Sequence, residues 1–178
     1  MKKITFCFLF VFLSSEIFGD EFYTSNLDAY VGIWNYTSSN MQFSMQLKRG
    51  TEKLFFMDNA IPTLIGDYVL IANKDTICAP SPINLNVTDE NIGTAIIIAN
   101  NASTQEEYVN DSILHVLFYD KTSQTRTPCT CTIQLLSKTK IELRFSASEG
   151  VYEDNVSTLK VPIPEVLILT KQRISIKR

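Results

Sequence analysis

Regular alternation of apolar and polar residues is the feature of this 178-residue sequence that most constrains its fold. The clearest example is the segment 41–48, which reads Met41, Gln42, Phe43, Ser44, Met45, Gln46, Leu47, Lys48. A period of two places alternate side chains on opposite faces of a β-strand, so this segment is expected to bury one face and expose the other. Gly50 is expected to end the strand.

Two later segments have the same period and are expected to pair as a hairpin. The first alternates Cys129, Cys131, Ile133 and Leu135 with polar residues, and the second alternates Ile141, Leu143 and Phe145 in the same way. The polar stretch 137–140 between them predicts a tight turn.

Apolar stretches at 64–72, 92–99, 113–119 and 166–171 are further expected strands, and Ile33 is expected to start the first one. Together these segments predict about eight strands, and no long segment has a helical period. Strands joined by turns and loops form an antiparallel sheet. The sequence therefore predicts an all-β fold, a single antiparallel up-and-down β-barrel, with a β-sandwich as the alternative.

The first 19 residues have the pattern of a signal peptide. Lys2 and Lys3 precede an apolar run from Ile4 to Leu13, followed by polar residues and by Gly19. About ten apolar residues are too few to cross a bilayer as a helix, and no later stretch approaches that length. We therefore expect a signal peptide at 1–19, one barrel domain at 20–178, no membrane span, and a secreted or periplasmic location. The mildly acidic charge, −3 for the whole chain, argues against nucleic acid as a partner.

Three cysteines remain after the signal peptide: Cys78, Cys129 and Cys131. In an oxidising compartment, Cys78 is a candidate to form a disulfide with Cys129 or Cys131, and a buried thiol is the alternative for each. Cys129 and Cys131 would lie on one face of a strand, at the outer limit of disulfide reach. With a single histidine in the chain, the ligand count for zinc is not met, and no metal or cofactor is expected.

The stretch Leu27 to Trp34 contains the only tryptophan and predicts a short helical turn, which Gly32 ends before the first strand. Gly32-Ile33-Trp34 after such a turn, with Leu-Ile-Leu-Thr-Lys at the end of the chain, resembles the lipocalin and fatty-acid-binding (calycin) superfamily. More closely, the chain is similar to a family of small secreted proteins of Bacteroidetes-type bacteria, catalogued as a lipocalin-like domain of unknown function. The resemblance implies that Gly32 and Trp34 close one end of the barrel and that Lys171 or Arg173 covers the indole ring.

The leading functional hypothesis is a non-enzymatic exported protein that holds a small apolar ligand in the barrel. Phe43, Met45 and Phe145 are the candidates to line that site, because eight strands leave room for one small ligand or a filled core. The alternative is a filled barrel that binds another protein, whose identity the sequence does not indicate, through the loops Asn100–Asp111 and Ser148–Lys160.

Catalysis has no anchor in the sequence. His115 lies alone in an expected strand, and neither a nucleophile elbow nor a phosphate-binding glycine loop is present. A hydrolase would need two acids, or an acid and His115, to converge in one cleft. No catalytic residue is therefore assigned.

Overall fold

The computed structural model describes residues 27–55, 59–92, 95–100, 112–122, 128–145 and 163–173. The expected signal peptide at 1–19 lies outside the described residues, as does nearly all of the two loops considered for partner binding. The described elements are η1 (Leu27–Tyr30), β1 (Gly32–Thr37), β2 (Met41–Lys53), β3 (Ile61–Ala72), β4 (Asp75–Cys78), β5 (Asn86–Thr88), β6 (Ile97–Asn100), β7 (Ile113–Tyr119), β8 (Pro128–Ser137), β9 (Lys140–Phe145) and β10 (Val166–Lys171).

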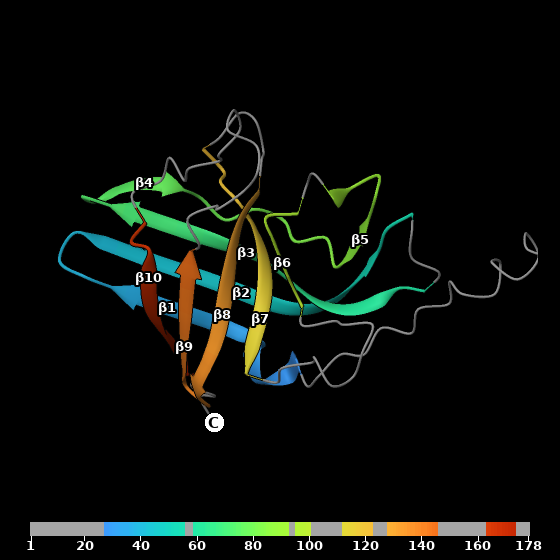
Figure 1. Ribbon diagram of the computed structural model, residues 1–178. Helices are drawn as coiled ribbons and strands as arrows, with labels where there is room; N and C mark the ends of the chain where they lie inside the picture. The colour runs from blue at the N-terminus through green and yellow to red at the C-terminus, as the bar shows by residue number, and fades with distance from the viewer. Residues whose placement is uncertain are drawn as a thin grey trace, which may run out of the picture.

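Eight of these strands close into an antiparallel barrel, which confirms the predicted fold class. Around the barrel the order is β1-β2-β3-β6-β7-β8-β9-β10, and β10 pairs back onto β1 with Trp34 opposite Lys171. Figure 1 shows β7, β8 and β9 crossing in front of β1, β2 and β3. Two short strands extend the sheet: β4 pairs with the end of β3, and β5 pairs in parallel with the end of β2.

The long hairpin of β2 and β3 is the largest element, and it continues past Gly50 to Lys53. Gly50 was expected to end the strand, but the chain passes so close to the carbonyl of Leu85 and the side chain of Ile65 that a Cβ would overlap both. The glycine therefore permits close packing within the strand. Gly66 has the same role in β3, where a Cβ would overlap the carbonyl of Gln46.

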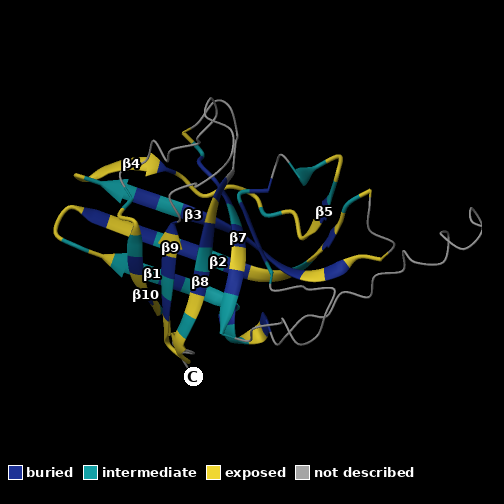
Figure 2. Ribbon diagram, in the orientation of Figure 1, coloured by how far each residue is buried: buried dark blue, intermediate teal, exposed yellow. Residues whose placement is uncertain are grey.

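The main core fills the inside of the barrel. Alternate residues of every barrel strand point inward, and Figure 2 shows the resulting bands of buried and exposed residues along the strands. In β2 the inward residues are Met41, Phe43, Met45 and Leu47, the set that the alternation predicted.

A second, smaller core lies on the outside of the wall formed by β3, β6 and β7. Ile65, Ile98 and Tyr119 project outward there and are covered by residues of the segment 79–92, which we call the outer strap. The strap is held to β2 through β5 and through the amide of Thr51, which donates to the carbonyl of Leu85 at 2.9 Å. Because both faces of this wall are covered, the apolar run at 92–99 has no polar alternation.

Candidate functional site

One end of the barrel is closed by Trp34 and the residues around it. Trp34 is fully buried, and its indole Nε1 donates to the carbonyl of Tyr30 at 2.7 Å, which ties η1 to β1. The ammonium of Lys171 lies 5.0 Å from the centre of the indole ring and donates to the carbonyl of Ala29 at 3.1 Å. Cation–π contact and hydrogen bond together fix the helical turn over the barrel end.

Gly32 makes this arrangement possible. Its φ of +141° lies in a region that residues with a Cβ rarely adopt, and a Cβ would come within 2.8 Å of Lys171 Cε. Arg173, the other candidate for covering the indole, lies exposed beyond the end of β10. These contacts join η1, β1 and β10 at this end of the barrel.

Four aromatic rings cross the interior of the barrel toward the opposite end. Phe43 stacks on Tyr68 with ring centres 5.6 Å apart, and Tyr68 stacks on Phe118 at 4.6 Å. Phe118 meets the edge of Phe145 at 5.1 Å. The four residues come from β2, β3, β7 and β9 and are at most 6% exposed. We call them the aromatic row. Tyr68 and Phe118, and likewise Phe118 and Phe145, come from strands separated by one strand in the barrel, so the row occupies part of the interior.

The predicted ligand-lining residues lie inside the barrel. Phe43 and Phe145 are the two ends of the aromatic row, and Met45 is fully buried one inward position along β2 from Phe43. Their side chains pack against protein neighbours in the main core.

A buried polar cluster lies where β3 changes its neighbour from β6 to β4, a place we call the seam. Lys121, just after β7, reaches into it. Its ammonium donates to the carbonyls of Tyr68 at 2.8 Å and Ala79 at 2.6 Å, and lies 2.5 Å from Oδ1 of Asp67. The Asp67 contact lacks hydrogen-bond geometry and is therefore an ion pair. The other carboxylate oxygen of Asp67 accepts from the amide of Ser81.

The hydroxyl of Tyr68 also belongs to the seam. It accepts from the backbone amide of Lys121 at 3.1 Å, and the thiol of Cys78 lies 3.6 Å away. Burial raises the pKa of the Tyr68 hydroxyl far above its ordinary value, and burial also raises the pKa of the Cys78 thiol. The Tyr68 hydroxyl and the Cys78 thiol are therefore neutral. Neutral groups are weak nucleophiles, so we interpret the cluster as a structural contact between β3, β4 and the end of β7.

No disulfide joins Cys78, Cys129 and Cys131 in the structure. Cys78 points toward Tyr68, while Cys131 lies in the main core on the same strand face as Cys129. Next neighbours on one strand face are held at the limit of disulfide reach by the extended backbone. Burial raises the pKa of the Cys131 thiol, which keeps it protonated and unreactive.

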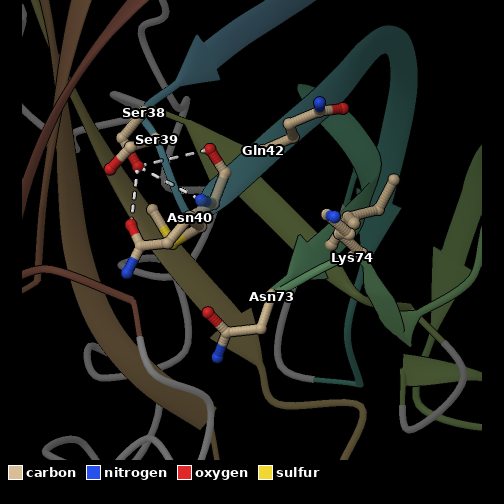
Figure 3. A pocket seen from close by; sticks show the side chains of 8 residues that line it. Ser38, Ser39, Asn40, Gln42, Asn73 and Lys74 are labelled. Atoms are coloured by element: carbon tan, nitrogen blue, oxygen red, sulfur yellow. Dashed lines mark hydrogen bonds between the residues drawn. The ribbon is translucent and has the colours of Figure 1, made fainter.

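Sequence reasoning missed a surface groove of about 340 Å³ at the tips of two neighbouring hairpins. Figure 3 shows its lining, which comprises Ser38, Ser39, Asn40, Met41, Gln42, Ile71, Asn73 and Lys74. The two tips are tied together by the amide of Asn73, which donates to the carbonyl of Asn40 at 2.8 Å. Strand periodicity carries no signal for such a groove, because turn residues belong to neither face.

The remaining candidate groups lie apart in the described part of the chain. There, no three His, Cys, Asp or Glu side chains gather closely enough to hold a metal ion. His115 lies on the exposed face of β7. Within the same residues, no helix is long and apolar enough to pass through a bilayer.

A protein-family model described as "Family of unknown function (DUF6705)" matches residues 1–172. Neither the curated proteins nor the solved structures contain a match to the chain.

Proposed function

The chain belongs to the family of unknown function DUF6705, and we propose that it is an exported, non-enzymatic binding protein with a lipocalin-like barrel. In this proposal the barrel is a solid scaffold, and recognition takes place on its outer surface. Two sequence features support a relationship to secreted lipocalin-like proteins of Bacteroidetes-type bacteria. One is the Gly32-Ile33-Trp34 stretch, and the other is the N-terminus, where two lysines precede an apolar run.

The aromatic row is the observation that carries this proposal. An apolar ligand at that level would have to displace rings that already contact each other at 4.6 to 5.6 Å. The energy of those contacts would be lost before any ligand contact formed, which opposes binding.

A small apolar ligand inside the barrel is the second candidate. Two methionines, Met41 and Met45, lie in the same core as the aromatic row. Because methionine side chains adapt to irregular shapes, they could repack around a ligand if the rings moved apart.

An apolar fluorescent dye such as 1-anilinonaphthalene-8-sulfonate separates the two. The native protein is expected to show no saturable dye binding, whereas Phe118→Ala removes one of the two middle rings of the aromatic row. That change opens an apolar cavity and should allow the variant to bind the dye or benzene. Phe118→Ala should also lose about 3 to 5 kcal/mol of stability. Phe55→Ala is the matched control, because Phe55 is 88% exposed.

Saturable one-to-one binding by the native protein, as tight as that of Phe118→Ala, would reject the solid scaffold in favour of the second candidate. If Phe118→Ala does not fold, Phe118→Leu opens a smaller cavity and serves the same comparison.

Export is tested separately. Full-length protein produced in a Bacteroidetes-type host is expected outside the cytoplasm, with a mature N-terminus near Asp20 by mass spectrometry. Intact protein that keeps Met1 in the cytoplasmic fraction would contradict the proposal.

A further inference from the structure

The groove lies between two hairpin tips that are joined by a backbone hydrogen bond. Its two tips are the turn between β1 and β2 and the turn between β3 and β4. Between them, Met41 pairs with Ala72 in the sheet, and the hydrogen bond from Asn73 to Asn40 continues this pairing into the turns. Its volume of about 340 Å³ falls within the range of small-molecule sites, about 300 to 1,000 Å³.

The amide of Asn40 presents donors to this groove. The hydroxyl of Ser38 donates to Oδ1 of Asn40 at 3.1 Å, and the backbone amide of Met41 donates to the same hydroxyl at 3.2 Å. The first bond uses one lone pair of the Asn40 amide oxygen, and the second holds the turn. The NH₂ group of Asn40 supplies two donors that a ligand can meet. Figure 3 shows these bonds, with Asn73 on the neighbouring tip.

The groove carries positive charge from Lys74. Asn73 and Lys74 have φ values of 52° and 75°, the left-handed pair that a two-residue hairpin turn requires. Lysine is uncommon in that conformation, because its Cβ crowds the backbone there. No carboxylate is among the lining residues, and the adjacent acid, Asp75, belongs to β4 rather than to the lining.

Amide NH₂ groups, hydroxyls and one ammonium supply hydrogen-bond donors to the lining, beside the apolar side chains of Met41 and Ile71. Such a lining complements acceptor oxygens that carry negative charge, with which donors form their strongest hydrogen bonds. We propose that the groove binds an anionic oxygen group, a carboxylate, sulfate or phosphate, carried by a small hydroxyl-rich molecule. This inference rests on the proposed function, because it places recognition on the outer surface of the scaffold.

Titration of the ¹⁵N-labelled protein with four related sugars tests it. Glucuronate, glucose 6-sulfate and glucose 6-phosphate carry the three anionic groups, and glucose is the neutral control. At least one anionic sugar is expected to shift the amide signals of residues 38–42 and 71–74, with about tenfold weaker binding for glucose. Which sugar binds best identifies the anionic group. The affinity should fall as salt screens the charge.

Two variants localise the effect. Lys74→Met is expected to weaken binding of the anionic sugar about tenfold, because it removes the charge but keeps the length of the side chain. Lys138→Met is the matched control, since Lys138 is an exposed turn lysine between β8 and β9 and should leave the affinity unchanged.

Equal binding of glucose, equal effects of the two lysine variants, or no shifts with any sugar would overturn the inference. If the native protein still excludes apolar dye in that case, the solid-scaffold proposal stands and only the groove ligand is rejected.

Discussion

Replacing Lys121 by methionine should destabilise the fold by about 3 to 5 kcal/mol, because the change leaves a buried charge without its partner. Asp67 and Lys121 have side chains only 6% and 11% exposed, so water cannot readily replace the lost ammonium. Methionine keeps the length and the apolar stem of lysine, and the substitution therefore isolates the loss of the charged group.

The magnitude follows from the contacts at the seam. The largest part is the uncompensated carboxylate of Asp67, for which breaking a buried pair costs about 3 to 5 kcal/mol. The carbonyl of Tyr68 also loses its donor, which alone would cost about 1 to 3 kcal/mol. The two costs are not additive, because relaxation at the seam can relieve both. The expected total loss of stability is therefore about 3 to 5 kcal/mol, the cost of breaking the buried pair.

Urea unfolding followed by the fluorescence of Trp34, the single tryptophan, measures the change directly. For a domain of this size the loss corresponds to a melting temperature lower by about 6 to 20 °C. Lys138→Met is the control, since an exposed lysine should change stability by less than about 0.5 kcal/mol.

Adding Asp67→Asn to Lys121→Met removes the unpaired charge while an amide oxygen can still accept from Ser81. The double variant should therefore recover part of the lost stability. A cost below about 1 kcal/mol for Lys121→Met, or no recovery in the double variant, would refute the role assigned to this ion pair.

Two further variants test other parts of the fold. Gly32→Ala should destabilise the protein by about 1 to 3 kcal/mol, because alanine is strained at φ +141° whether or not Lys171 moves aside; urea unfolding that matches the native protein would contradict this. Glu52→Gln tests a buried acid whose pKa burial raises above its ordinary value of 4.5, against a hydrogen bond from Asn100 that lowers it. The folded protein then holds this proton more tightly than the unfolded chain, so the contribution of Glu52 to native stability falls as pH rises above about 4.5. Glu52→Gln should accordingly be more stable than the native protein at pH 7 and lose that advantage below pH 4.5, and a pH-independent difference would count against the burial argument.

The sequence predicted the strands in which one face or both faces are buried, because burial gives such strands an alternating or a wholly apolar pattern. The bounds expected for β7 and β10 agree with the structure, because each of these strands has a buried inward face. β4 was not recognised as a strand because Asp75, Thr76 and Ile77 are exposed, so no burial pattern marks it.

The features that depend on residues far apart in sequence could not be predicted. The seam brings Lys121 to Asp67 only after β7 and β3 have taken their places in the barrel. The groove likewise depends on which two turns become neighbours. Alternation shows which side chains point inward, but it does not show which rings from non-neighbouring strands meet, as Tyr68 and Phe118 do.

The position of the outer strap has a consequence for how the molecule comes apart. None of the pairings that close the barrel involves the strap, so it can detach while the eight-stranded ring stays intact. Its amide protons should then exchange with solvent faster than those of β2 and β3. The opened form would expose Ile65, Ile98 and Tyr119 on the outer face of the barrel wall. Aggregation under mild heating should therefore begin from this partly opened species, before the barrel itself unfolds.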